Sequence, residues 1–160
     1  MGETIVVGMA DMKMCRVPDQ ITTLGLGSCI GLALYEPRTH ISALLHIMLP
    51  DSTTIKDNSN VAKFADTAIA KILQDFKKCG ISPFMLNAKM AGGAKMFAFN
   101  NNDVFSVGKK NADAIKAILS RERIKLIAED CGGNYGRTVV FSPEDFSFTI
   151  KSIGKQPVVI

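Results

Sequence analysis

Short apolar runs bounded by turn residues fill most of the chain, and two stretches have the spacing of an amphipathic helix. Between residues 61 and 76 apolar side chains recur every three or four positions, with N-cap candidates at 58–60 and Gly80 after the end. A second helix is predicted from Asn111 to about Arg121. The other runs predict strands at residues 4–10, 21–24, 30–35, 40–49, 84–90, 104–107, 124–128, 137–141 and 146–153.

This order of elements predicts a mixed, largely antiparallel β-sheet with two main helices, in the α/β class as an α+β layered sandwich. No internal repeat, low-complexity tract or Pro/Gly/Ser-rich linker divides the 160 residues. A chain of this length is within the usual size of one domain. We therefore expect a single domain over residues 1–160.

The runs 30–35 and 40–49 flank Glu36-Pro37-Arg38-Thr39, in which Pro37 suits the second position of a type I turn. The simplest hairpin register places Cys29 opposite His46, with side chains roughly 4.5–5.5 Å apart at Cβ. A β-bulge or a different loop length would shift this pairing. The apolar pairs expected on the other face are Ile30 with Leu45, Leu32 with Ala43 and Leu34 with Ile41.

A thiol beside an imidazole suggests nucleophilic catalysis, with Cys29 as nucleophile and His46 as its base. Thr23, on the preceding predicted strand, could accept a hydrogen bond from the second imidazole nitrogen. His40 is predicted on the same face, about three residue pairs further along. Taken singly, a buried cysteine is more often a small apolar residue, so the prediction depends on the coincidence of these groups.

The segment before the cysteine is rich in glycine. Gly25 and Gly27 would let the backbone adopt positive φ, so that N–H groups around Ser28 and Cys29 point together at a substrate oxygen. Such a pair would stabilise an oxyanion. Glycine-flanked small residues also mark ordinary tight turns.

The other cysteines, Cys15, Cys79 and Cys131, have no histidine or second cysteine at a diagnostic spacing, and we interpret them as structural thiols. Neither C-x-x-C pairs nor paired carboxylates favour a metal site. The glycine clusters lack the patterns of nucleotide-binding loops. No cofactor is expected.

A formal net charge of +4 arises from short basic runs that resemble solvated helix ends, which makes nucleic-acid binding a weak hypothesis. A mildly basic surface would equally suit an acidic protein partner. We find no signal peptide and no long apolar segment. The expectation is a cytoplasmic protein without membrane insertion.

Two segments, Thr23-Leu24-Gly25-Leu26-Gly27-Ser28-Cys29 and His46-Ile47-Met48-Leu49-Pro50, resemble the CheD family of chemoreceptor glutamine deamidases. Later motifs continue the resemblance in order across nearly the whole chain. They are Gly92-Gly93-Ala94-Lys95-Met96-Phe97, Val107-Gly108-Lys109-Lys110-Asn111, Asp130-Cys131-Gly132-Gly133 and Gly136-Arg137.

The resemblance implies a layered α/β fold similar to the catalytic part of cytotoxic necrotizing factor toxins, with Cys29, His46 and Thr23 as the catalytic set. It implies a protein-glutamine glutaminase that converts glutamines of methyl-accepting chemoreceptor cytoplasmic domains to glutamate in chemotaxis adaptation. It also implies a CheC-type phosphatase as a partner. Two alternatives stay open: a non-enzymatic adaptor for receptors or that phosphatase, and a thiol amidase or transglutaminase acting on other proteins.

Overall fold

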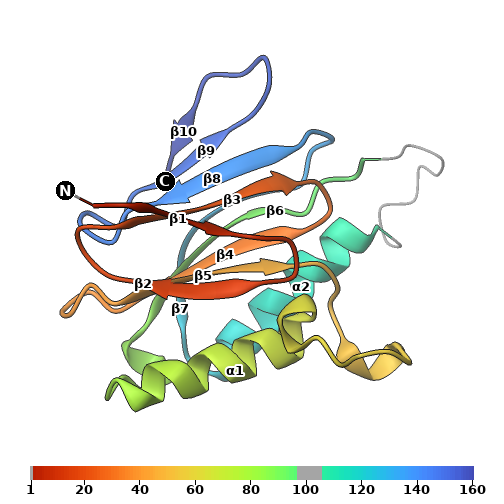
Figure 1. Ribbon diagram of the computed structural model, residues 1–160. Helices are drawn as coiled ribbons and strands as arrows, with labels where there is room; N and C mark the ends of the chain where they lie inside the picture. Colours follow the sequence, from red (N-terminus) through yellow and green to blue (C-terminus); the bar gives the residue numbers. More distant parts are fainter. Residues whose placement is uncertain (1, 97–105) are drawn as a thin grey trace.

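A computed structural model of the chain describes residues 2–96 and 106–160, in which two five-stranded sheets stack on one another (Figure 1). The first sheet has the order β1-β3-β8-β9-β10 and the second the order β2-β5-β4-β6-β7. The first comprises β1 (Thr4–Val7), β3 (Gln20–Leu26), β8 (Arg137–Phe141), β9 (Phe148–Lys151) and β10 (Val158–Val159). The second comprises β2 (Met12–Cys15), β5 (Ser42–Ile47), β4 (Ile30–Tyr35), β6 (Asn87–Gly92) and β7 (Lys125–Cys131).

Both sheets are mixed, because β1 pairs with β3 and β6 pairs with β7 in parallel while the other pairs are antiparallel. The long helices are α1 (Ala65–Lys78) and α2 (Val107–Arg121), and short 3-10 turns occupy Ser52–Thr54, Val61–Lys63 and Pro83–Met85. The predicted layered α/β sandwich with two main helices is therefore confirmed. Its strands are shared between two sheets, and β2 and β10 were not predicted.

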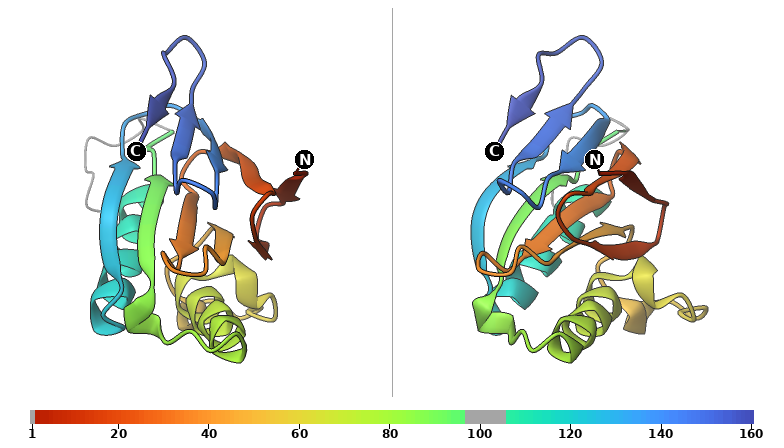
Figure 2. Two further views of the ribbon diagram at one scale, coloured as in Figure 1. Left: turned by 90° about the vertical axis from the view of Figure 1, so that its left-hand side faces the viewer. Right: turned by 60° about the vertical axis from the view of Figure 1, so that its left-hand side comes forward.

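The second sheet is the middle layer of three. Every residue of β4 and β5 is buried, so both faces of these strands are covered. One face packs against α1 and α2 through apolar residues such as Leu32 and Leu45, and the other packs against the first sheet through Ala33 and Leu44. Figure 2 shows the helices and the first sheet on opposite sides of the middle layer.

The observed helix ends are set by capping residues and differ from those that the apolar spacing predicted. Asn60 caps the 3-10 turn at 61–63 and α1 begins only after Phe64, while Gly80 follows the helix at φ +79°. The prediction of a strand at 104–107 is wrong at Val107, which begins α2 behind the N-cap Ser106; positions 104–105 lie outside the described residues.

The hairpin of β4 and β5 forms, but its predicted register is wrong by two residues. Ile30 pairs with Ile47, and Gly31 rather than Cys29 lies opposite His46. The reason is a longer turn: six residues separate the strands, and the Glu36 carbonyl oxygen accepts from the backbone N–H of His40. The buried Glu36 carboxylate accepts from the N–H groups of Arg38 and Thr39 inside the turn.

A shift by two residues preserves the faces, since side chains alternate along a strand. His46 still points to the side of the second sheet that Cys29 and Leu44 occupy, facing the first sheet. At one end of the molecule, on the right of Figure 1, the C-terminal ends of β3, β5 and β6 and the first turn of α2 come together. The loop from β3 to β4, which carries Cys29, lies at this end.

Candidate active site

A hydrogen bond between the sheets joins two of the predicted site residues. The hydroxyl oxygen of Thr23, on β3, lies 2.7 Å from Nδ1 of His46, on β5. Both side chains are buried, with exposures of 0% and 1%. Gly31, opposite His46 on β4, leaves room for this approach, because a Cβ there would lie 2.9 Å from Cδ1 of Leu26 and 3.6 Å from Cγ2 of Thr23. The predicted contact between Thr23 and His46 is confirmed.

The partners of Thr23 determine which imidazole nitrogen carries the proton. The Thr23 hydroxyl also lies 2.7 Å from the carbonyl oxygen of Val7, which can only accept. A hydroxyl has one proton, so it donates to Val7 and must accept from Nδ1–H of His46. The neutral ring therefore has an unprotonated Nε2, and this atom is buried without a hydrogen-bond partner among the described residues.

Cys29 lies just before β4, on the same side of the second sheet as His46. The register of the hairpin begins at the pair Ile30–Ile47, so Cys29 lies one residue beyond the paired region, and the alternation of side chains places it on the face of His46. No hydrogen bond joins the thiol to Nε2 in the resting structure. The thiol is only 8% exposed. The two groups share a side of the sheet at its end without a hydrogen bond between them.

Burial sets the charge state of both groups. Burial raises the pKa of the Cys29 thiol above its ordinary value, an effect that the backbone N–H of Cys29 opposes. Burial also lowers the pKa of the His46 imidazole. At neutral pH the resting pair is thus a thiol and a neutral imidazole, so the base must remove the proton during attack.

Three consecutive carbonyl groups fix the loop that carries Cys29. The carbonyl oxygen of Gly27 accepts from the N–H of Ala94 at 2.8 Å, and that of Cys29 accepts from the N–H of Gly93 at 2.9 Å. Between them, the Ser28 carbonyl accepts from a side chain on α2. No backbone carbonyl in the described ranges accepts from the N–H of Ser28 or of Cys29. These two N–H groups are the candidates for the predicted oxyanion donors, and that role stays a prediction.

The two glycines of this loop differ in conformation. Gly25 has φ +69°, in agreement with the prediction, whereas Gly27 does not have a positive φ, and that prediction is wrong. Gly27 instead gives room to a neighbouring side chain, because a Cβ there would lie 3.1 Å from Cγ of Met96.

Two glycines outside the loop allow β6 and α2 to pack closely around it. A Cβ on Gly92, at the end of β6, would lie 2.2 Å from the Cys29 carbonyl oxygen. A Cβ on Gly108, in the first turn of α2, would lie 2.5 Å from the carbonyl carbon and oxygen of Gly93. Close backbone packing explains why the segments 92–94 and 107–111 contain glycine where they do.

Sequence reasoning missed two buried polar residues next to this loop. Asn111 on α2 donates from Nδ2 to the carbonyl oxygens of Ser28 and Met48, each at 2.9 Å. The guanidinium of Arg137 on β8 donates to the carbonyl oxygens of Gly92 and Gly132 at 3.3 and 2.9 Å. Both lie in motifs visible in the sequence, but their contacts join segments far apart in the chain.

The second histidine lies away from the site. His40 precedes β5 at φ +64°, stacks on Phe146 with ring centroids 4.7 Å apart, and has Nδ1 2.7 Å from the Pro143 carbonyl oxygen. The β4–β5 turn that holds it lies at the end of the strands remote from Cys29. His40 is part of the packing around the turn.

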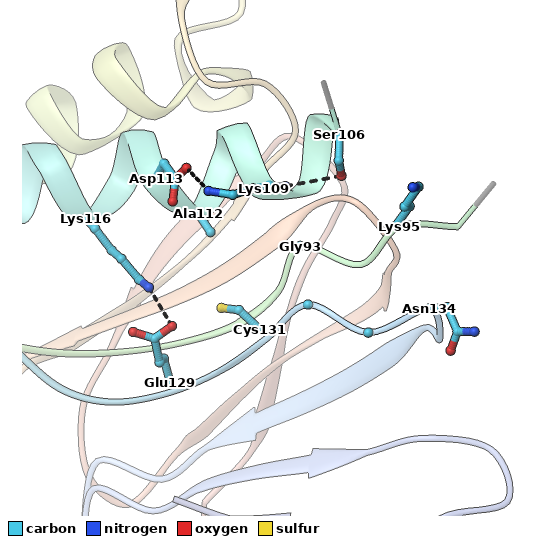
Figure 3. Close-up of a pocket in the computed structure, with 12 residues that line it drawn as sticks. Gly93, Lys95, Ser106, Lys109, Ala112, Asp113, Lys116, Glu129, Cys131 and Asn134 are labelled. Atoms are coloured by element: carbon cyan, nitrogen blue, oxygen red, sulfur yellow. Dashed lines mark hydrogen bonds and ion pairs between the residues drawn. The ribbon is translucent and has the colours of Figure 1, made fainter. Parts of the chain in front are cut away.

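A pocket of about 640 Å³ opens between α2 and β7, beside Gly93 (Figure 3). Its walls carry ion pairs between Lys116 and Glu129 and between Lys109 and Asp113, each at 2.7 Å. The Cys131 thiol points into it, and burial, followed by the charge of Glu129, raises its pKa to about 12. Cys131 is therefore a protonated thiol at neutral pH, consistent with a structural role.

Burial likewise raises the pKa of Cys15 to about 12, and Cys79 is exposed at the end of α1. A raised pKa is common to Cys15, Cys29 and Cys131, so it does not distinguish the nucleophile. Cys15 also faces the first sheet, but it pairs with Ser42, four residues from His46 along β5, whereas Cys29 lies at the His46 end of the hairpin, where the imidazole Nε2 has no hydrogen-bond partner among the described residues.

Within the ranges 2–96 and 106–160, no group of three or more His, Cys, Asp or Glu side chains is arranged to hold a metal ion. No helix in those ranges is long and apolar enough to span a membrane.

Comparison with known proteins identifies the family. Residues 48–152 match the family model CheD, described as chemotactic sensory transduction. A protein of Lachnoclostridium phytofermentans named probable chemoreceptor glutamine deamidase CheD is 54% identical over 97% of each chain. One of Syntrophomonas wolfei with the same name is 47% identical over 96% of each chain.

A protein of Bacillus licheniformis named chemoreceptor glutamine deamidase CheD is 46% identical over 93% of this chain and 90% of its own. Among solved structures, a Neisseria meningitidis protein aligns with 82% of this chain and 63% of its own at a TM-score of 0.42 and 9% identity, too distant to inform fold or function. The match of the family model to two thirds of the chain and the identity to relatives over almost all of it agree: the chain belongs to the CheD family.

Proposed function

We propose that this chain is a protein-glutamine deamidase that converts specific glutamines of methyl-accepting chemoreceptors to glutamate, with Cys29 as nucleophile. The names of its relatives support the substrate and the reaction. The observation that carries the assignment of residues is the bond from His46 to Thr23, which leaves Nε2 as an unpaired buried acceptor on the thiol's side of the sheet.

In the first half of the reaction, Nε2 of His46 takes the thiol proton as the Cys29 sulfur attacks the side-chain amide carbon of glutamine. An S–C bond forms and the carbonyl oxygen becomes an oxyanion, which the N–H groups of Ser28 and Cys29 stabilise. The C–N bond then breaks, and His46 returns its proton to the departing ammonia. Cys29 is left as a thioester of the former glutamine.

In the second half, the imidazole removes a proton from water, which attacks the thioester carbonyl. The C–S bond breaks, glutamate is released and the proton returns to sulfur. The sum is glutamine plus water giving glutamate plus ammonia, so the reaction requires no cofactor or redox partner. Thr23 keeps Nδ1 protonated and the ring oriented throughout, as the third member does in other triads.

The products explain a role in chemotaxis adaptation, because each conversion adds a negative charge and a carboxylate that can be methylated. Substrate sites on the cytoplasmic domains of receptors imply that the protein acts in the cytoplasm. A CheC-type phosphatase as partner, implied by the family resemblance, stays a prediction. A Cys29→Ala variant should bind such a partner unchanged in a pull-down, because only the chemistry is removed.

The test is mass spectrometry of a receptor cytoplasmic fragment after incubation with the protein. Each converted glutamine gains about 1 Da, and ammonia appears in equal amount. A parallel reaction with an added primary amine separates deamidation from transglutamination, which would yield an amine adduct instead of glutamate. A fragment left unmodified by the folded protein would refute the proposal, and adducts as the main product would favour the transglutaminase alternative.

A further inference from the structure

Asn111 ties together the chain segments of the nucleophile and of the base. Its side chain is fully buried, and Nδ2 donates to the carbonyl oxygens of Ser28 and Met48. Ser28 immediately precedes Cys29, and Met48 lies two residues beyond His46. One amide group from α2 therefore holds both segments at the end of the second sheet.

The orientation of this amide is determined by its neighbours. Both acceptors are carbonyl oxygens, which cannot donate, so the atom that faces them is Nδ2 and not Oδ1. Oδ1 is buried and has no hydrogen-bond partner in the described part of the chain. A buried acceptor without a partner lowers stability. The side chain thus makes two donor bonds to the loop segments and leaves its acceptor unused.

Because the peptide unit is planar, the hydrogen bond to the Ser28 carbonyl also fixes the direction of the Cys29 N–H. In a trans peptide the carbonyl and the following N–H point in opposite directions. Asn111 draws the Ser28 carbonyl toward α2, on the helix side of the second sheet. The Cys29 N–H then points to the opposite side, where His46 contacts Thr23. No carbonyl in the described ranges accepts from this N–H.

We propose that Asn111 is a positioning residue: by holding the Ser28 carbonyl, it aims the Cys29 N–H at the oxyanion that forms when the Cys29 sulfur attacks a carbonyl carbon. The inference rests on the proposed function, because it assumes acyl transfer at Cys29. Asn111 itself touches neither substrate nor sulfur in this account. Its effect should appear only in reactions that pass through an oxyanion.

Two small reagents, one that reacts through an oxyanion and one that does not, test this effect without a receptor substrate. p-Nitrophenyl acetate acylates a thiol through a tetrahedral oxyanion, forming an S–C bond and releasing p-nitrophenolate while the thiol proton passes to His46. Iodoacetamide alkylates the same sulfur by direct displacement of iodide, with no oxyanion. Mass spectrometry of the peptide that contains Cys29 gives both rates at this residue, and their ratio isolates oxyanion stabilisation.

The test variant is Asn111→Asp, which keeps the shape of the side chain and replaces the donors by carboxylate oxygens. Acylation of Cys29 should fall on the order of 10²-fold, the loss typical of one oxyanion donor, while alkylation changes far less. Acylation relative to wild type should partly recover as the pH falls, because a protonated carboxyl regains one O–H donor.

Ile115→Val is the matched control. Ile115 lies one turn further along α2, is fully buried and makes no polar contact with the loop, so its ratio of acylation to alkylation should equal that of the wild type. If circular dichroism shows that Asn111→Asp is unfolded, Asn111→Ala, which buries no charge, is measured in the same two assays.

A ratio that stays at the wild-type value, or two rates that fall in parallel, would overturn the proposal and leave Asn111 a purely structural residue. Failure of the proposed function has a different signature. In that case wild-type Cys29 is acylated and Asn111→Asp is impaired, but no receptor glutamine is converted.

Discussion

The hydroxyl of Thr23 serves two neighbours at once, so removing it should affect catalysis more than folding. In Thr23→Val, His46 loses the acceptor that keeps Nδ1 protonated, and Val7 loses a donor. We expect kcat for deamidation to fall about 10²-fold, within the range of general base catalysis. The free energy of unfolding should fall by about 2 kcal/mol for two buried groups left unpaired. Thr23→Ser, which keeps the hydroxyl, should recover most of the activity.

Thr22→Val is the control for this substitution. Thr22 adjoins Thr23 on β3, and its buried hydroxyl donates to the carbonyl oxygen of Val139 at 2.7 Å without contacting the imidazole. It should lose about 1 kcal/mol of stability and little activity. Equal losses of kcat in Thr22→Val and Thr23→Val would contradict the orienting role of Thr23.

The lowered pKa of His46 predicts the acid side of the pH–rate profile. Catalysis requires the neutral imidazole, and burial lowers its pKa below the usual value of about 6.5. kcat/KM should therefore be constant between about pH 7 and 9 and fall with a midpoint below pH 6.5. Initial rates on a receptor fragment test this directly. A rate that rises continuously through pH 9 would indicate a free thiolate nucleophile instead.

At the residue scale, the sequence predicted those contacts whose partners lie in neighbouring segments. Thr23 and His46 belong to predicted strands that are separated by one other strand, 30–35, and their hydrogen bond is observed. Asn111 escaped prediction because it reaches the Cys29 loop from a helix more than 80 positions later in the chain. The only signals were its place in a family motif and a polar residue on an otherwise apolar helix face.

Two glycines with similar backbone requirements allow a test of how tightly the site is enclosed. Gly92 has φ +117°, and a Cβ there would meet the Cys29 carbonyl oxygen at 2.2 Å. Gly80 has φ +79° in open space after α1. Gly92→Ala should lower the free energy of unfolding by about 3–5 kcal/mol, from overpacking and φ strain together, and Gly80→Ala by about 1–2 kcal/mol from φ strain alone.

Urea unfolding of both variants measures the difference, and the deamidation assay reports the geometry of the loop. Gly92→Ala should also lose activity under conditions in which it is still folded, because its new methyl group displaces the Cys29 carbonyl. If both glycine variants were equally stable and active, the close approach of β6 to the loop would be unimportant.

At the element scale, the strands of the hairpin were predictable but its register was not. The apolar run 30–35 coincides with β4. The turn was misjudged because Glu36 uses its own carboxylate to bind backbone N–H groups, which lengthens the connection beyond what Pro37 suggests. The error was two residues, and so Cys29 and His46 kept a common face. An error of one residue would have separated them.

At the scale of the whole molecule, the elements predicted the layered class but not the division into two sheets. The central pairing of the first sheet joins β3 to β8, more than 100 positions apart, and no local pattern records such a partner. This division creates the site, because it brings Thr23 of one sheet against His46 of the other.

The buried thiols should make the free energy of unfolding decrease at alkaline pH. Burial raises the folded-state pKa of Cys15 and Cys131 to about 12, so their stabilising effect is complete below the unfolded value of about 8.5 and is lost as pH rises toward 12. The free energy of unfolding, measured in urea, should decline from pH 8 to 10. The double variant Cys15→Ala/Cys131→Ala should decline less steeply; an identical slope would contradict this assignment.

The most direct test of the account is the behaviour of Cys29→Ala beside Cys131→Ala on one receptor fragment. The account predicts that Cys131→Ala converts glutamine to glutamate at nearly the wild-type rate. Cys29→Ala should still bind the fragment but produce no gain of mass at any glutamine. Conversion that persists at the same glutamines in Cys29→Ala would contradict the central claim that the Cys29 sulfur carries out the reaction.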